Sequence, residues 1–458
     1  MDGKDKWIAN RQSEEAEQQE KRHSYREAYL FFGLIVVLGI IGNIAFSIIG
    51  LKLTHIEKHN LGLTAGGFGT LGLILGIPAY LQPFLGGISD LYPILGYRRR
   101  SYWFLGHLTI AASLIGFTLL KTYTYYPALA LLLLQGFGGL FAGVAFNAVM
   151  VRVGNRTGLF GSMQSVSQLV PTILAIAGTS HLAGYAAQYW SAHRCFVTAL
   201  LLYLCSLPFV FLFPEKRAEV HKMTEEEKLE HQRKHILQNQ NTKAALKKAA
   251  STPGLWAIVA FVFYLILTPA PPTYFYQRNG LHFSLQFIGN LGIWSSSGIL
   301  IGLGLFTILS RYLPVWSLVW GAYLMDCIGY IFNFYMLGPR SAEMVTLFGA
   351  IIGIIYSLML YTLAARATPK GIEGTVYGLV LSAIALGSAL GTKIGYNIYD
   401  MFGGLNAANH SAILQGWRWS NGFGFVFTVI AIVFIPFLPK WTHSRSLLKD
   451  TTQMENGA

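Results

Sequence analysis

The sequence predicts an all-α membrane protein with twelve transmembrane helices arranged as two six-helix bundles. Three observations support this class. The chain of 458 residues is 53% hydrophobic and only 12% charged, which is about half the charged fraction of a soluble domain. Its apolar residues fall in long runs, as helices that cross a membrane require. Its basic residues gather between these runs, which is typical of a topology with positively charged cytoplasmic loops.

A spanning helix needs about 20 mostly apolar residues to cross the hydrocarbon core. With this length as the criterion, the chain contains twelve candidate spans. The first six lie at 28–51, 66–88, 101–121, 125–150, 158–181 and 192–213. The second six lie at 253–273, 285–310, 314–337, 344–365, 374–399 and 418–438. The least apolar of them are 158–181 and 285–310.

Charged segments divide the chain into domains. Residues 1–27 and 439–458 form terminal tails, and the hydrophilic segment 214–252 links bundles at 28–213 and 253–438. With both termini on one side, the tails, the linker and the even-numbered loops hold 26 of the 34 Lys and Arg residues. This asymmetry predicts that both termini are cytoplasmic and that the protein is a multi-pass component of the plasma or inner membrane.

The composition also argues against several function classes. The formal net charge of +13 does not indicate nucleic-acid binding, because the basic residues are spread over many short segments instead of one folded face. The three cysteines and the twelve histidines lack metal-ligand spacing within the spans. We therefore expect no metal, no cofactor and no enzymatic reaction. The sequence contains no Walker motif, so we do not expect this chain to use ATP directly.

The connection between the second and third spans carries an unusual charge cluster. Residues 86–100 read GGISDLYPILGYRRR. Asp90, at a helix end, can accept hydrogen bonds from backbone amides or arginines of a neighbouring helix and so close that side of the protein in one conformation. The positive-inside rule explains the arginines alone but leaves the acid and the glycines unexplained. We therefore predict a cytoplasmic gate here, formed by Asp90, Gly96, Arg98, Arg99 and Arg100.

This loop resembles the signature of the major facilitator superfamily, in which Gly, Asp, Gly and paired basic residues recur between helices two and three. The longer stretch GGISDLYPILGYRRRSY is similar to the folate–biopterin transporter family. A second match is the segment 365–374, ARATPKGIEG, because that family places a Pro-Lys-Gly-x-Glu motif between helices ten and eleven. Arg366, Lys370 and Glu373 in this segment can form a charge relay that matches the Asp90 cluster in the other bundle.

The resemblance implies a secondary active transporter that moves a small organic solute, such as a pteridine or folate, by alternating access. A carrier of an unrelated solute, such as a sugar or sugar–peptide, and a non-transporting sensor on the same fold are the alternatives. The expected partners are the small-molecule substrate, the lipid bilayer and a coupling ion, either H⁺ or Na⁺. The sequence departs from the family at Gln82, where the family usually has a lysine, and from the superfamily at Leu132, where an arginine is linked to proton handling.

Two charged residues lie well inside the predicted spans, Asp326 in the ninth and Lys393 in the eleventh. A charge at the centre of a span costs about 2.5–3.5 kcal/mol on insertion scales, so we expect such residues to have partners or to line water. Asp326 is a candidate for pairing with Lys393, for ion coupling or for a structural role. Lys393 can meet an anionic solute with its long stem, or extend toward the membrane surface.

The resemblance implies that helices one, four, seven and ten line a central cavity. Amide and tyrosine side chains there suit a neutral or weakly charged, partly planar solute, although hydrogen bonds between helices are an alternative role for each of them. The candidate substrate-binding residues are Asn43, Gln82, Gln135, Asn147, Gln164, Gln168, Tyr264, Tyr356, Tyr361 and Lys393.

Glycines at four-residue spacing predict close approach between helices. The pairs and triplets are Gly72 with Gly76, Gly298 with Gly302, and Gly387 with Gly391 and Gly395. In the seventh span, the prolines within residues 269–272 must interrupt the helical hydrogen bonds.

Overall fold

The structure is a computed structural model of the whole chain, and it describes residues 3–82, 84, 97, 99–157, 159–212, 253–313, 315–367, 373–405 and 409–437. The regular elements in these residues are helices. Those of the first half are α1 (Gly3–His59), α2 (Ala65–Leu75), α3 (Ile77–Tyr80), α5 (Arg100–Leu119), α6 (Tyr125–Thr157), α7 (Phe160–Leu174), the π-helix η1 (Ala175–Thr179), α8 (Ser180–Tyr189), α9 (Ala192–Ser206) and the 3₁₀-helix η2 (Leu207–Leu212). Those of the second half are α11 (Pro253–Ile266), α12 (Thr273–Phe275), the π-helix η3 (Tyr276–Gly280), α13 (Leu285–Tyr312), α14 (Val315–Asn333), α15 (Pro339–Ala367), α16 (Glu373–Tyr399), the π-helix η4 (Asp400–Gly404), α17 (His410–Ile430) and the 3₁₀-helix η5 (Ala431–Phe437).

Each of the twelve predicted spans has a helical counterpart. Within the described residues, nine helical segments are long and apolar enough to cross a membrane, and the apolar helices α2 and α11 are shorter. The position of α14 corresponds to the ninth predicted span. The linker 214–252 and the tail 439–458 lie outside the described residues.

Several helices extend beyond the limits of the predicted spans. The first helix begins at Gly3, well before residue 28, and the twelfth begins at His410 instead of 418. The second span is broken at Gly76, between α2 and α3. The fifth span continues through a π-helical turn to Tyr189, because a stretch of small and polar residues can remain helical where it packs against other helices.

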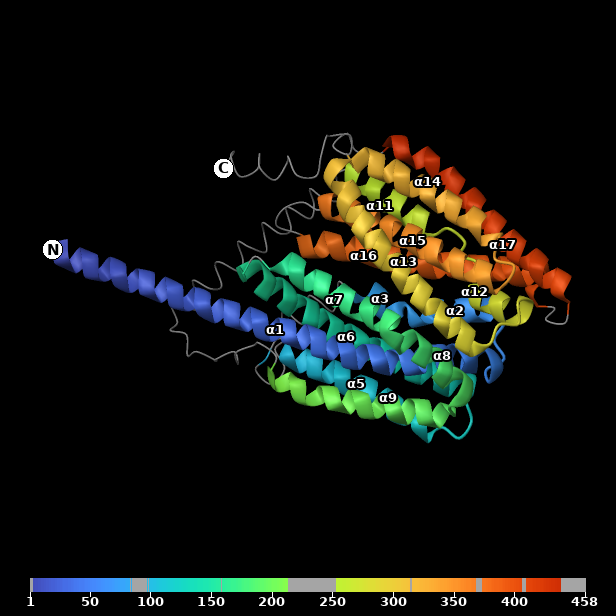
Figure 1. Cartoon of the computed structure of the whole chain (residues 1–458), viewed down its shortest axis with the longest axis horizontal. Helices are drawn as coiled ribbons and strands as arrows, with labels where there is room; N and C mark the ends of the chain where they lie inside the picture. Colours follow the sequence, from blue (N-terminus) through green and yellow to red (C-terminus); the bar gives the residue numbers. More distant parts are fainter. Residues whose placement is uncertain are drawn as a thin grey trace.

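The two halves of the chain form two bundles that lie side by side along the long axis of the molecule (Figure 1). Helix α1 starts and helix α17 ends toward the same end of this axis (Figure 1). At the opposite end lie the last turn of α1, the first turn of α2, and the junction of α16 with η4. This opposite end is named the closed end, because hydrogen bonds join the two bundles there.

Each bundle has its own apolar interior. In the first bundle, Phe31, Trp103 and Met163 belong to one buried cluster, and Phe117 stacks on Phe196 in a second, with ring centroids 4.7 Å apart. In the second bundle, Phe261 is fully buried in a third cluster that α11, α14, α15 and α16 build together. Because lipid is as apolar as these side chains, close van der Waals packing is what stabilises such contacts.

Glycines allow the closest helix crossings. A Cβ atom added to Gly106 would lie 2.5 Å from the Gly138 carbonyl oxygen, so the backbones of α5 and α6 touch. The predicted role is confirmed for Gly391, whose Cβ would lie 2.6 Å from the Thr268 oxygen, and for Gly298, which faces the Leu347 carbonyl. It was wrong for Gly72, where an added Cβ would meet no atom within 4 Å.

The prolines of the seventh span interrupt it as predicted. Helix α11 ends at Ile266, and helical structure resumes at Thr273. The interrupted backbone is satisfied by neighbouring helices: the Ala270 N–H donates to the Gly391 carbonyl at 3.2 Å, and the Pro269 carbonyl accepts from the Tyr330 hydroxyl at 3.2 Å. Irregular backbone at this depth is tolerated because protein groups replace water as partners.

Candidate functional site

The two bundles meet at the closed end through helices α2 and α16. The N–H of Gly66, in the first turn of α2, donates to the Asp400 carboxylate at 2.6 Å. One turn further along, a Cβ on Gly69 would lie 2.8 Å from the Lys393 Cα, so the two backbones are in direct contact. Phe68 packs on this joint, with its ring edge against Phe275 at a centroid distance of 5.8 Å.

A second joint pairs helices α8 and α13. A Cβ on Gly184 would lie 2.7 Å from the Gln286 carbonyl oxygen, and one on Gly289 would collide with the Gly184 backbone. His181 hydrogen-bonds to Asn290 across the joint at 2.9 Å. Near the end of α8, Gln188 accepts the N–H of Leu285 at 3.0 Å, and Tyr189 donates to Gln286 at 3.3 Å.

A third contact, which we name the seam cluster, is made by charged and aromatic residues. It consists of His55, Glu57, Lys58 and His59 in the last turns of α1, with Tyr274, Arg278 and Asn279 of the segment α12–η3. The Lys58 ammonium donates to Asn279 across the bundles and lies 5.6 Å from the centroid of the Tyr274 ring. The cross-bundle hydrogen bonds named in these three contacts all lie at one end, so we describe that end as closed.

Much of the predicted cytoplasmic gate lies outside the described residues. This applies to Asp90, Gly96, Arg98 and Lys370, and to the side chains of Arg366 and Glu373, whose backbones belong to the last turn of α15 and the first residue of α16. Arg100 begins helix α5, and its guanidinium packs over the rings of Tyr97 and Phe211 at 5.1 and 5.2 Å. Arg99 precedes it at the helix N-terminus.

Three amide candidates of the first bundle are partly buried. Asn43 of α1 accepts a hydrogen bond from the Thr179 hydroxyl of η1 at 3.1 Å. Its amide oxygen is therefore already used in a contact between two helices. The Gln135 Oε1 atom of α6 is buried and has no hydrogen-bond partner among the described residues. Gln82 is half-buried beyond the end of α3. Of these, Gln135 is the side chain with an unused buried acceptor.

Two further amides of the first bundle are exposed. Asn147 of α6 and Gln168 of α7 both present their side chains at the surface of the helices. The side chain of Gln164 lies outside the described part of the chain, so the predicted pairing of Gln164 with Gln168 on one face of a helix stays a prediction.

The candidates of the second bundle differ in how their polar groups are used. The Tyr264 hydroxyl donates to the Phe427 carbonyl of α17 at 3.2 Å. Tyr356 is only 8% exposed, and its hydroxyl has no partner among the described residues, whereas Tyr361 is 40% exposed. Lys393 is half-buried in the α2–α16 joint.

Asp326 lies on α14 and faces α17, where the buried Thr428 hydroxyl donates to its carboxylate at 3.2 Å. The hydrogen-bond partner of this carboxylate among the described residues is thus a hydroxyl group and not a base.

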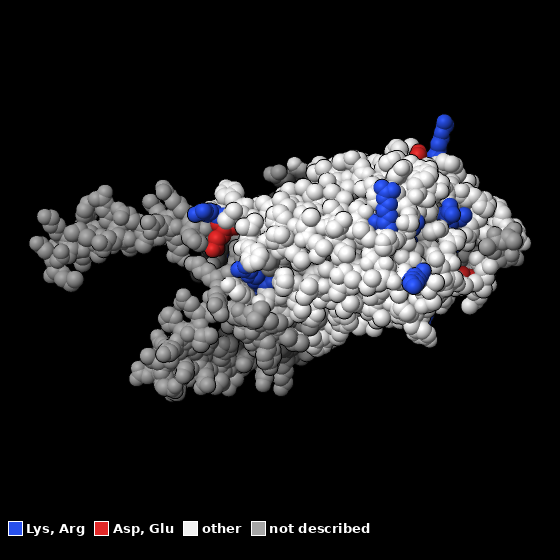
Figure 2. All heavy atoms as spheres, turned by 90° about the horizontal axis from the view of Figure 1, so that it is seen from below, with Lys and Arg blue, Asp and Glu red and all other residues white. Residues whose placement is uncertain are grey.

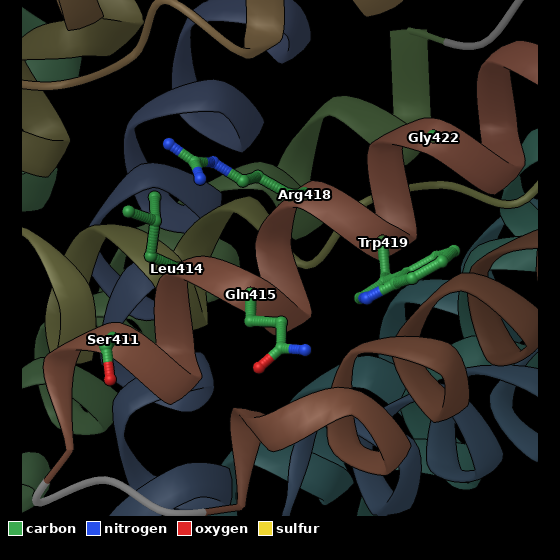
Figure 3. A pocket seen from close by; sticks show the side chains of 6 residues that line it. All are labelled: Ser411, Leu414, Gln415, Arg418, Trp419 and Gly422. Carbon is green, nitrogen blue, oxygen red and sulfur yellow. The ribbon is translucent and has the colours of Figure 1, made fainter.

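A shallow hollow lies along helix α17 (Figure 3). Six residues that fall on one stripe of the helix line it, namely Ser411, Leu414, Gln415, Arg418, Trp419 and Gly422. None of the predicted substrate residues belongs to this hollow. Trp419 is 44% exposed and stacks on Phe402 at a centroid distance of 4.8 Å.

The charged side chains of the described residues gather toward the two ends of the molecule. Figure 2 shows Lys, Arg, Asp and Glu near both ends of the long axis, with an uncharged band between them on the face that is drawn. Such a band is the surface expected where the protein meets lipid, because a charge exposed there would lose its water.

Comparison with protein families identifies relatives of this chain. The model of the BT1 family matches residues 44–440. The "Folate-biopterin transporter" of Synechocystis sp. is 27% identical over 365 residues, which cover 75% of this chain and 70% of the relative. "Folate transporter 1" of Plasmodium falciparum is 23% identical over 372 residues, which cover 76% of this chain and 69% of the relative.

Solved structures confirm the predicted fold. A D-xylose–proton symporter superposes with a TM-score of 0.65 at 13% identity, over 91% of this chain and 99% of its own. A point mutant of the nucleoside transporter NupG gives 0.63 at 13% identity, over 88% and 99%. At this identity the likeness concerns the fold alone. The chain has the major facilitator fold of a multi-pass membrane transporter, and it belongs to the BT1 family.

Proposed function

We propose that this chain is a secondary active carrier of pteridine-containing solutes, such as folate or biopterin, and that it moves them between its two bundles by alternating access. Membership of the BT1 family carries the proposal, and the two relatives named for folate and biopterin support the solute class. The arrangement of the bundles supports the mechanism, since the named cross-bundle contacts gather at one end.

The orientation follows from the distribution of charge. With both termini in the cytoplasm of a plasma or inner membrane, the closed end would face outward. Transport then requires the α2–α16 and α8–α13 joints to part while the other end closes. The proposed cytoplasmic gate, formed by the Asp90 loop and the segment 365–374, would hold that other end shut.

The solute would bind between the bundles at about mid-depth. Gln135 supports this proposal with a buried carbonyl oxygen that no described donor satisfies, and Tyr356 supports it with a buried hydroxyl in the same condition. An unmade hydrogen bond in a buried place costs about 1–3 kcal/mol, so a solute that supplies the missing partner binds more tightly. The flat pterin ring offers both donors and acceptors.

Ion coupling is proposed at Asp326, with H⁺ as the coupling ion. A carboxylate whose described neighbours are hydroxyls has no cation to balance its charge when it is deprotonated, so uptake and release of a proton is the simplest way to change its state. The Thr428 hydroxyl can donate to the carboxylate and can accept from the protonated acid.

Uptake into liposomes containing the purified protein tests the proposal. We expect accumulation of radiolabelled folate or biopterin above that in protein-free liposomes, with excess unlabelled pteridine competing. Uridine and xylose are matched control solutes, because the fold is shared with carriers of nucleosides and of xylose. Uptake of either control in preference to both pteridines would contradict the solute assignment. An absence of transport for all four solutes would favour a sensor on the same fold.

A further inference from the structure

The seam cluster contains more positive charge than a latch between two bundles requires. A latch needs one bond, and the bond from Lys58 to Asn279 provides it. Arg278 directly precedes Asn279 in the chain, so a second cation lies next to the residue that Lys58 binds. The rings of His55 and His59 are themselves in contact, with centroids 4.3 Å apart. Two cations, one from each bundle, thus lie at one contact beside a pair of imidazole rings.

The bases of the seam cluster are not neutralised by its acid. Glu57 is only 7% exposed, and none of the hydrogen bonds or ion pairs found among the described residues joins its carboxylate to Lys58 or Arg278. Arg278 donates through Nη1 to the Phe283 carbonyl at 2.5 Å, which is a neutral partner. The Nε atom of Arg278, the Nδ1 atom of His55 and the Tyr274 hydroxyl are buried without a hydrogen-bond partner among the described residues.

The seam cluster lies across the contact between the two bundles. Lys58 belongs to the first bundle and Arg278 to the second, and the contact between Lys58 and Asn279 joins them at the closed end. Opening of this end in the proposed transport cycle would break this bond and free the Lys58 ammonium for a solute. Tyr274 and Phe275 lie beside the Lys58 ammonium and offer flat ring surfaces at the same place.

From these contacts we propose that Lys58 and Arg278, flanked by His55 and His59, form a receiving site for the carboxylate of the solute at the entrance of the closed end. A guanidinium matches a carboxylate with two parallel hydrogen bonds, and an ammonium adds a point charge. The carrier therefore selects pteridines that carry a carboxylate tail over uncharged pterins. This inference rests on the proposed function and narrows it.

Uptake kinetics of two solutes test the site. Folate carries carboxylates and biopterin carries none, so their KM values are compared in intact bacterial cells that express the full chain, with vector-only cells as background. We expect Arg278→Met and Lys58→Met each to raise the ratio of the folate KM to the biopterin KM about tenfold. This is the effect expected when one charge-assisted hydrogen bond to the folate carboxylate is lost. Arg278→Lys should restore most of the folate affinity, since it keeps the charge.

Two control variants separate a receiving site from a latch. Lys121→Met removes an exposed positive charge from the α5–α6 turn at the same end, and it should leave the KM ratio unchanged. Asn279→Ala breaks the latch bond without removing a cation, and it should change the kinetics of both solutes together. Higher ionic strength should weaken folate uptake more than biopterin uptake, because salt screens the attraction.

The outcomes distinguish the two proposals. If wild-type cells take up both pteridines and Arg278→Met changes both KM values equally, the receiving site is wrong and the carrier assignment stands. An Arg278→Lys variant with the same defect as Arg278→Met would likewise overturn it. If wild-type cells take up neither pteridine, the solute class is wrong and the receiving site is withdrawn with it.

Discussion

At the scale of single residues, the described structure explains one of the two intramembrane charges better than the sequence could. Asp326 accepts a hydrogen bond from the Thr428 hydroxyl at 3.2 Å. The sequence left open a pairing of Asp326 with Lys393. The two side chains serve different contacts, since Lys393 lies in the α2–α16 joint. The hydroxyl contact of Asp326 supports its proposed coupling role.

The substitution Asp326→Asn tests this role. The amide keeps the shape of the side chain and can still accept from Thr428, but it cannot take up or release a proton. We expect the variant to lose most pteridine accumulation driven by a pH gradient, while exchange of labelled for unlabelled solute continues. Both rates are measured in the same liposomes, with Thr428→Val as the control for the hydrogen bond. Retention of gradient-driven accumulation would show that Asp326 is structural.

At the scale of helices, glycine decides where the bundles can touch. Gly184 of α8 and Gly289 of α13 face each other, and Gly69 of α2 faces the Lys393 backbone of α16. Contacts of this kind have no interlocking side chains, so the helices can separate without changes of rotamer. They depend on the absence of a Cβ atom, and the two joints are therefore sensitive to the smallest substitution.

Gly184→Ala should loosen the closed end. The added Cβ would lie 2.7 Å from the Gln286 carbonyl oxygen, and overpacking of this kind typically costs about 1–3 kcal/mol. That cost falls on the closed state alone, so the open state should gain population by roughly tenfold or more. The distance between spin labels at Lys121 and Arg340, which are exposed near the closed end on different bundles, should increase in electron paramagnetic resonance measurements.

The matched control for this substitution is Gly143→Ala in α6, where an added Cβ would meet no atom within 4 Å. This variant should keep the wild-type distance distribution. Equal distributions for Gly184→Ala and the wild type would mean that the α8–α13 joint does not hold the closed end together.

At the scale of the whole molecule, the two bundles combine a fixed interior with a separable interface. Each bundle has its own buried clusters, whereas Ala65 and Phe68 of the first bundle pack into a cluster of the second at the closed end. This division is what a rocking carrier needs, because the interiors persist while the interface opens. It also requires that the closed end face the side opposite the termini.

Accessibility labelling tests that orientation in intact cells. In a background with the three native cysteines replaced by alanine, single cysteines at positions 121 and 340 should react with a membrane-impermeant maleimide. A cysteine in the segment 214–252 should react only after the cells are permeabilised. Reaction of all three positions from the outside would overturn the predicted topology and the assignment of the closed end to the outer face.

The sequence by itself determined the fold and the family, because long apolar runs and the Asp90 loop are local features that need no partner. It also located the break at residues 269–272 and the crossings at Gly298 and Gly391. The predicted limits at residues 418 and 181 differ from the observed helix ends at His410 and Tyr189, since the ends of a helix depend on what the flanking turns pack against. The seam cluster was missed entirely, although Lys58 and Arg278 were visible in the sequence as two of the few basic residues in predicted outer connections.

Only the tertiary structure decided which of these residues meet. Lys58 and Asn279 lie in different halves of the chain, as do Gly66 and Asp400, and no periodicity in either half encodes the distance between them. Hydropathy depends on each residue and its neighbours in the chain, and it therefore specifies helices and their depth in the membrane. The closed end arises from the docking of two bundles, a contact between surfaces that form only after each half has folded.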